Sequence, residues 1–502
     1  MLAMSDQLTA LDATFLELEQ MDEGATMHIG GVLVFDPLPD GTVPALEAVC
    51  TDIASRLTLL PRFSQRLSSQ RTGGLTWPRW VDDPQFDIRN HVHHAALPAP
   101  GGDAELCEWA ADFFSHRLDR TRPLWEMVLV EGLEHGRWAL ATKTHHSLVD
   151  GVGSVDIMHL LFDGERTAPP TAASSAADEP HSHWPEHVPH PPDAVAELAR
   201  TGARAAVAGM HAALHPRETL EKSRSLAELF VRDEVIAAPC TSLNVPIGPT
   251  RRFEIVRASL PEIKAIAHEL GGSVNDIVLA ACTTGLRRLL LSRREPPPSD
   301  GLRAMVPMNV RSASEQLALG NRISSLFVEL PVAEPDASAR LRKIVEHTRR
   351  LKSSNAALGA DTIIELTALA PPLLHALIAR SLYATRLFNV TITNVPGPQI
   401  PLYAFGAALR EDHPLVPLAA GHAVGIAIIS YNGGVVLGLS ADCDSTPDLH
   451  VLAEGVEEGF AELRALISSK APRHSAKAKS TKSSPSRTVA ATTKSTARAS
   501  AR

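Results

Sequence analysis

Two adjacent histidines at the end of an apolar, β-branched run are the feature of this sequence best suited to chemistry. They open the string HHSLVDG, His145–Gly151, which overlaps the end of a run of strand length, Arg137–His146. Neighbouring side chains of a strand point to opposite faces, so only one of the two histidines can face a cavity. A histidine takes and returns a proton near neutral pH. The pair therefore indicates general acid–base chemistry rather than a metal held by both rings.

The aspartate and glycine that close this string have supporting roles. Asp150 lies four residues after His146, where it can brace either the loop or the imidazole, and Gly151 allows the chain to turn close to a substrate channel. Taken alone, a pair of histidines at a strand end is most often structural. The other motifs of the chain have to decide between the two interpretations.

These other motifs occur in a fixed order and carry a family resemblance. HHSLVDG matches the H-H-x-x-x-D-G signature of the CoA-dependent acyltransferase superfamily. The chain also contains PLWE at Pro123–Glu126, SVND at Ser273–Asp276, GNR at Gly320–Arg322 and NVPGP at Asn394–Pro398. Together they resemble the bacterial wax ester synthase/diacylglycerol acyltransferases. The resemblance extends from about residue 8 to 466, and this collinearity is more specific than any single motif.

The resemblance implies an acyltransferase that uses acyl-CoA as co-substrate, with no bound cofactor and no metal. The acceptor would be the hydroxyl of diacylglycerol or of a long-chain alcohol. His146 would be the general base, with His145 supporting it, Asp150 holding or orienting the loop and Gly151 forming its turn. Two alternatives keep the same fold. One acylates another lipid or a polyketide hydroxyl, and the other is a weakly catalytic lipid-binding or lipid-droplet protein.

Three residues outside the histidine motif are candidates for the neighbourhood of the site. Asn275 and Asp276 cap an expected helix over Ser273–Arg293, or they lie near the substrate. Trp125 is expected to fill the core beside the channel. The histidines without motif support, His91, His93 and His94, are expected at the surface.

The length of 502 residues favours two domains, and strands and helices alternate in both halves. We expect an N-terminal acyltransferase domain over 1–165, a Pro-, Ala- and His-rich connector over 166–192, a C-terminal acyltransferase-like domain over 193–469, and a tail over 470–502. Expected elements include strands at Met27–Asp36 and Arg137–His146 and a hairpin of Ala423–Tyr431 with Val435–Asp442. The resemblance implies an α/β fold of two mixed-sheet domains like those of chloramphenicol acetyltransferase, forming a pseudo-dimer with a tunnel between them.

Charge is divided unevenly between the body of the chain and its tail. Nine of the 48 Lys and Arg residues lie in Lys470–Arg502, which has no Asp or Glu, so residues 1–469 hold 39 basic against 57 acidic side chains. The body therefore has a net charge of −18, which argues against a nucleic-acid partner. The tail lacks aromatic residues and is expected to be disordered. Its charge suits a peripheral contact with an anionic membrane or a lipid droplet.

The remaining composition points to the cytoplasm. The five cysteines are scattered without a C-x-x-C pair, and the acidic residues within 1–21 do not fit a signal peptide. We expect a cytoplasmic protein that is soluble or peripherally attached to a membrane or lipid droplet.

Overall fold

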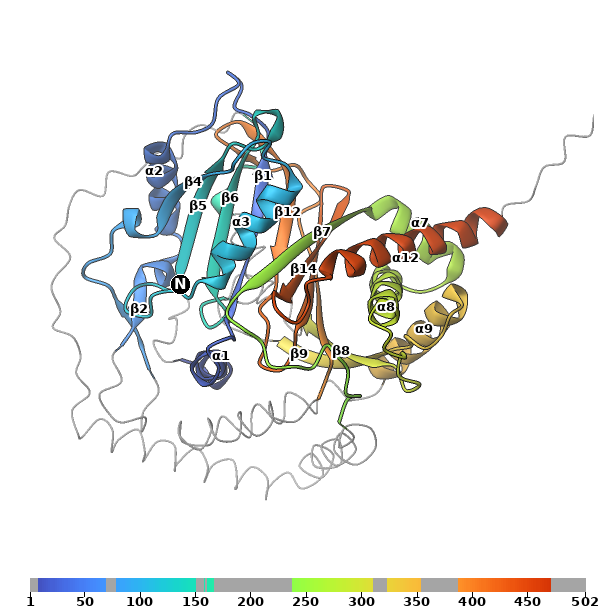
Figure 1. Ribbon diagram of the computed structural model, residues 1–502. Coiled ribbons are helices and arrows are strands. Elements are labelled where there is room, and N and C mark those ends of the chain that lie inside the picture. Colours follow the sequence, from blue (N-terminus) through green and yellow to red (C-terminus); the bar gives the residue numbers. More distant parts are fainter. Residues whose placement is uncertain are drawn as a thin grey trace, which may run out of the picture.

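Two six-stranded mixed sheets form the framework of the protein (Figure 1). The computed structural model describes residues 8–68, 78–149, 158, 160–166, 237–309, 323–353 and 387–470. The first sheet is built mainly from the N-terminal half, drawn in blue and cyan, and the second from the C-terminal half, drawn in green to red. The expected α/β fold with two mixed-sheet domains is confirmed.

The first sheet has the strand order β11-β12-β1-β6-β5-β4. Its neighbours are antiparallel except for β4 and β5, which run parallel. A separate antiparallel pair of short strands, β2 and β3, lies beside it. The bounds are β1 His28–Phe35, β2 Gln65–Leu67, β3 Trp80–Asp82, β4 Val92–Ala96, β5 Trp125–Glu131, β6 Trp138–His145, β11 Tyr403–Ala404 and β12 Ala407–Leu415.

The second sheet has the order β7-β14-β13-β10-β8-β9, with β13, β10 and β8 parallel to one another and the other neighbours antiparallel. Its strands β7-β14-β13-β10 repeat the order and the directions of β1-β6-β5-β4. The two halves are therefore an internal pseudo-duplication. The bounds are β7 Arg251–Ser259, β8 Leu302–Asn309, β9 Ile323–Leu330, β10 Val390–Pro396, β13 Val424–Tyr431 and β14 Gly434–Asp442.

Helices supply the apolar cover of each sheet. The two faces of the first sheet have separate cores, one including α3 and the other including α1 and α2. In the second half, α7, α8, α9 and α12 share a single core with the strands. The bounds are α1 Ala10–Met21, α2 Leu46–Leu57, α3 Asp103–Ser115, α7 Leu260–Leu270, α8 Val274–Ser292, α9 Ala337–Ser353 and α12 Leu449–Lys470.

One strand of the C-terminal half crosses into the first sheet. β12, drawn in orange, pairs along β1, although its residues lie within the segment 193–469 (Figure 1). An ion-pair network supports the crossing. Arg257 of β7 donates from Nε to the Glu411 carboxylate of β12 at 2.8 and 2.9 Å, and its two Nη atoms reach Asp103 of α3 at 2.7 and 2.9 Å. The two halves are thus joined by backbone pairing as well as by side chains.

The expected elements agree closely with the observed ones. The strand expected at Met27–Asp36 is β1, and the one at Arg137–His146 is β6. The expected hairpin is β13–β14, and its turn has positive φ at Asn432 and Gly433, 43° and 85°, as a two-residue hairpin turn requires. The connector 166–192, apart from Arg166, and the tail after Lys470 lie outside the described residues. None of the helices in the described ranges has the length and apolar character needed to cross a membrane.

The contact between β12 and β14 predicts that alanine destabilises the protein at one glycine of β14 and not at another. A Cβ on Gly438 would lie 1.8 Å from the carbonyl oxygen of Pro414, so β12 and β14 would have to separate. We expect Gly438→Ala to lower the free energy of unfolding by about 1–3 kcal/mol, the usual cost of overpacking. Denaturant titration measures this change.

Gly434→Ala in the same strand is the matched control. The nearest atom to a Cβ there, the Tyr431 carbonyl oxygen, lies at 3.4 Å, and Gly434 is exposed. Equal unfolding midpoints for the two variants would contradict the close approach of β12 to β14.

Candidate active site

The end of β6 separates the two histidines of the HHSLVDG motif. His145, the last residue of the strand, is 0 % exposed and pairs in register with His28 of β1. His146 follows it with a half-buried side chain, and its backbone N–H donates to the Met27 carbonyl at 2.8 Å. One ring is therefore enclosed, and the other retains access to solvent or substrate.

One face of α1 contacts both histidines. The Phe15 ring stacks on His146, with centroids 4.1 Å apart and an interplanar angle of 14°. Glu19 lies one helical turn later, and its carboxylate oxygen is 3.5 Å from Nε2 of His145. A reciprocal capping box between Thr9 and Asp12 fixes the start of this helix. The first helix thereby sets the orientation of both rings.

Glu19 is a buried carboxylate held by several donors. It is 1 % exposed and lies 3.2 Å from Nε2 of His28, while Arg120 donates to it from Nε at 3.1 Å and also from Nη2. Burial by itself would raise the pKa of Glu19. Hydrogen bonds from His145 and His28 outweigh burial and lower the pKa far below its usual range. Glu19 is therefore an anion enclosed by cationic and polar groups.

The hydrogen bonds of His145 define its protonation. Its Nδ1 accepts from the Ser147 backbone N–H at 3.1 Å and lies 2.8 Å from the Ser147 hydroxyl. An acceptor at Nδ1 places the ring proton on Nε2, which faces Glu19. Burial lowers the pKa of His145, so its ring is neutral near pH 7. His145 thus acts as a structural link between α1 and the loop after β6.

Trp125 starts β5, next to β6, and is fully buried. Its Nε1 donates to the Phe63 carbonyl at 2.7 Å, and its ring stacks on His91 with centroids 4.7 Å apart. The expectation that His91 lies at the surface is wrong, because its side chain is buried. Its Nδ1 also lies 2.9 Å from the Trp125 carbonyl oxygen, within hydrogen-bond distance. His93 and His94 are exposed as expected. The indole has the core-filling position that the sequence predicts.

The hydrogen bonds of Asn275 and Asp276 are structural. Asp276 accepts from the Ser273 backbone and hydroxyl, both at 2.7 Å, and from the Thr348 hydroxyl at 2.7 Å. It therefore caps α8 and ties it to α9. Asn275 accepts from the Asn394 side chain at 3.2 Å, which joins the start of α8 to β10. A role for either residue at the substrate stays a prediction.

Other expectations for the site fall outside the structure or differ from it. Asp150 and Gly151 lie outside the described residues. Within the described ranges, no cluster of His, Cys, Asp and Glu side chains is arranged to hold a metal ion. Sequence reasoning missed Glu19, His28 and Arg120. The sequence feature that could have indicated this cluster is Glu19 itself, an acidic residue four positions after Phe15 on the same, otherwise apolar, face of the helix.

Comparisons with known proteins cover almost the whole chain. The family model described as "Wax ester synthase/diacylglycerol acyltransferase catalytic domain" matches residues 8–278, and the "WS/DGAT C-terminal domain" model matches 319–464. Two Mycobacterium tuberculosis relatives, named probable diacylglycerol O-acyltransferases tgs1 and tgs2, are 32% and 31% identical to it. The alignments cover 92% of this chain in both cases, and 96% and 99% of the relatives.

Solved structures show the same fold. A wax ester synthase/diacylglycerol acyltransferase from Marinobacter aquaeolei VT8 aligns with a TM-score of 0.64 and 28% identity, covering 92% of this chain and 100% of that one. The first condensation domain of the calcium-dependent antibiotic synthetase aligns with a TM-score of 0.58 and 16% identity, covering 92% and 97%. The second likeness concerns the fold alone.

The buried histidines predict an acid-sensitive fold. Burial lowers the pKa of His28 from 6.5 to about 4, and it lowers that of His145 as well. Between about pH 6.5 and 4 the unfolded chain binds protons that the folded chain does not, so stability falls as the pH falls. Each histidine contributes a slope of at most about 1.4 kcal/mol per pH unit. We expect His28→Gln to flatten this slope in denaturant titrations across the range.

His268→Gln, at an exposed position of α7, is the control and should keep the wild-type slope. A wild-type protein whose free energy of unfolding is constant between pH 6.5 and 4 would contradict the burial of neutral His28.

Proposed function

Because this chain belongs to the wax ester synthase/diacylglycerol acyltransferase family, we propose that it transfers a fatty acyl group from acyl-CoA to the hydroxyl of diacylglycerol, and also to long-chain alcohols. The products are an ester, triacylglycerol or wax ester, and free CoA. The observation that carries this proposal is the pair of histidines at the end of β6, where a buried, neutral His145 stands next to an accessible His146.

His146 is the general base in this proposal. It takes the proton of the acceptor hydroxyl, the hydroxyl oxygen attacks the thioester carbon, and the carbon–sulfur bond breaks as the tetrahedral intermediate collapses. The protonated imidazole then returns its proton to the departing CoA thiolate. Stacking on Phe15 holds the ring, and the hydrogen bond from the His146 backbone N–H to the Met27 carbonyl holds the main chain, so little reorganisation is needed during the transfer.

His145 and Glu19 are positioning residues. The ionised Glu19 faces Nε2 of His145, and the Ser147 backbone N–H donates to Nδ1 on the other side of the ring. These two contacts fix the buried ring and, with it, the start of the loop that carries His146. Asp150 and Gly151 complete the loop in this proposal, Asp150 by orienting it and Gly151 by turning it.

The second half closes the other side of the site in this proposal. Ile429 and Tyr431 of β13 belong to the same apolar cluster as Trp125 and Leu148, so β13 contributes to the core of the first half. Trp125 backs the site from the first half. Asn275 with Asn394 and Asp276 lie where α8 begins and β10 ends. In this proposal that end of α8 faces the substrate.

Substitution of His146 tests the assignment directly. We expect His146→Ala to lower kcat by about 10²–10⁴-fold with palmitoyl-CoA and dipalmitoylglycerol, because the base is lost. Formation of labelled ester, separated by thin-layer chromatography, is the measurement. A thiol reagent for CoA release is unsuitable because Cys240 is exposed.

Two further variants sharpen this test. His268→Ala, far from the motif on α7, should keep wild-type turnover. Glu19→Gln retains the shape of the side chain without its charge and should lower kcat less than His146→Ala does. Wild-type turnover by a folded His146→Ala protein would eliminate His146 as the base, and wild-type protein that forms no ester would eliminate the proposed reaction.

We also propose that the tail brings the enzyme to an anionic membrane or lipid-droplet surface. The body, with its net charge of −18, is repelled by such a surface, whereas Lys470–Arg502 carries nine positive and no negative side chains. Acceptor and product lipids are insoluble in water, so attachment raises their local supply.

Truncation after Ser469 is expected to abolish co-sedimentation with vesicles of phosphatidylglycerol and phosphatidylcholine at low salt. Turnover of detergent-dispersed substrates should be unchanged, because the body is intact. Replacing the nine Lys and Arg residues of the tail with Gln keeps its length and serves as the charge control. Equal vesicle binding by the full-length and Gln-substituted proteins would remove the electrostatic role.

A further inference from the structure

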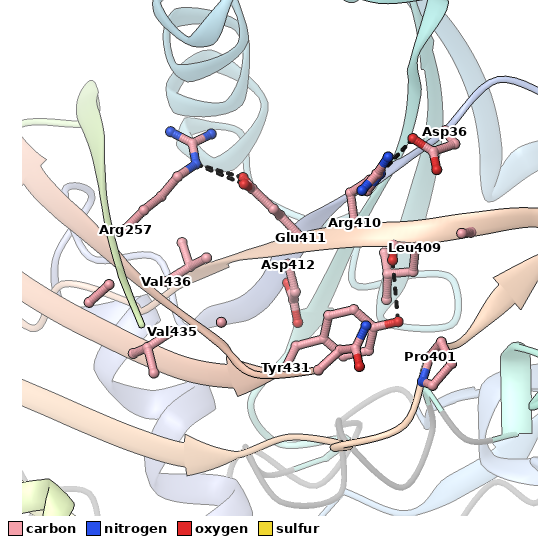
Figure 2. Close-up of a pocket in the computed structure, with 14 residues that line it drawn as sticks. Asp36, Arg257, Pro401, Leu409, Arg410, Glu411, Asp412, Tyr431, Val435 and Val436 are labelled. Carbon is pink, nitrogen blue, oxygen red and sulfur yellow. Dashed lines mark hydrogen bonds and ion pairs between the residues drawn. The ribbon is translucent and has the colours of Figure 1, made fainter. Parts of the chain in front are cut away.

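A cavity of about 450 Å³ lies where β12 meets the second sheet, and neither His145 nor His146 lines it (Figure 2). The strands touch where Gly438 approaches Pro414 and diverge toward Gly434 and Leu409, which leaves a wedge between them. A bulge in the β1–β12 ladder, between Val34 and Phe35, falls in the same stretch of β12. The cavity therefore results from the way in which β12 crosses from the second half to the first sheet.

Apolar side chains form part of the walls of this cavity, beside several charged ones. They include Pro401, Leu409, Val435, Val436 and the Tyr431 ring. The Tyr431 hydroxyl is engaged, because it accepts from the Leu402 N–H at 2.7 Å and donates to the Leu409 carbonyl at 3.3 Å. The tyrosine therefore presents its ring rather than a free hydroxyl to the cavity.

Most of the charged groups around the cavity are already paired. Arg257 binds Glu411, and Arg410 donates to Asp36 at 2.7 Å, as the dashed lines of Figure 2 show. A phosphate-bearing ligand would have to break one of these pairs. The lining thus favours an uncharged ligand.

Asp412 differs from these charged neighbours. Its side chain is on the cavity wall and only 6 % exposed, yet it accepts no hydrogen bond and forms no ion pair with any residue in the described part of the chain. With nothing to offset burial, the pKa of this carboxyl rises to about 7. A buried polar group without a partner is costly and rare, and a carboxylic acid in this state can both donate and accept a hydrogen bond.

The carboxyl of Asp412 lies on the same face of the first sheet as His146. Asp412 pairs with Leu33 of β1, and Leu33 pairs with Leu140 of β6, so these three side chains point to the same face of the sheet. His146 is six residues after Leu140, an even number, so strand alternation places its side chain on that face as well. The glycine at position 31 leaves room for the carboxyl, since a Cβ there would be 2.5 Å from Oδ1 of Asp412. By register, the two residues are roughly 20 Å apart. An extended chain of sixteen carbons has a comparable length.

We propose that this cavity is a subsite for the distal end of an uncharged acyl acceptor, and that Asp412 recognises a hydroxyl at that end. The inference rests on the proposed function in one respect, the placement of the reacting hydroxyl at His146. Acceptors that carry a second hydroxyl far from the first are then preferred over plain alcohols of the same length. The apolar walls accommodate the chain, and Asp412 supplies the polar contact.

The test compares hexadecanol with α,ω-hexadecanediol as acceptors for palmitoyl-CoA. Beyond the statistical advantage of two identical ends, the wild-type KM for the diol should be about fivefold lower, the value of one hydrogen bond. Asp412→Leu should remove or invert this preference with little change in kcat. Asp412→Asn, whose amide also donates and accepts, should retain it, and Asp300→Asn at an exposed turn should match the wild type.

Binding measured without turnover separates this inference from the proposed function. The dissociation constants of both lipids are determined by calorimetry on His146→Ala with and without Asp412→Leu. A diol preference that disappears with Asp412→Leu supports the subsite even if no ester forms. Equal affinity for the two lipids, or a diol preference that survives Asp412→Leu in a protein with an unchanged melting temperature, overturns it.

Discussion

The pairing of β1 on both of its edges sets the positions of the motif histidines and joins the two halves of the protein. On one edge β1 pairs with β6, the strand that ends in the histidines, and on the other it pairs with β12 from the C-terminal half. A shift of one residue in either register would move every side chain to the opposite face. The same ladder therefore buries His145 against His28, leaves His146 accessible, and holds the two halves together.

The burial of charge around Glu19 follows from this register. His28 and His145 are opposite each other on β1 and β6, and both rings face the carboxylate that α1 supplies. A buried carboxylate is tolerated only with strong partners, and Arg120 adds a cationic one. The cluster ties the first helix to β1, to the end of β6 and to Arg120. The hydrogen bonds that fix the two histidines offset the free-energy cost of removing the Glu19 carboxylate from water.

The pseudo-duplication allows equivalent positions of the two halves to be compared. β14 is the topological counterpart of β6, and it ends in Asp442 where β6 ends in His145. The Asp442 carboxylate accepts from the Gly248 N–H at 2.7 Å and from Ser445, so it closes a turn. The second half has kept the fold with a structural side chain at this position. The second half contributes β12 to the first sheet and part of β13 to the core of the first half.

Sequence alone determined the local features of this protein. Strand alternation at Arg137–His146 separated the roles of the two histidines, the turn residues at Asn432 placed a hairpin, and ordered motifs identified the acyltransferase fold, because each of these depends on neighbours in the chain. Only the tertiary structure decided the rest. Glu19, Arg120 and His28 meet His145 from distant segments, His91 is buried by stacking on Trp125, and Asp412 reaches the first sheet through a strand crossing. Such contacts depend on long-range register and burial, which no local pattern of residues encodes.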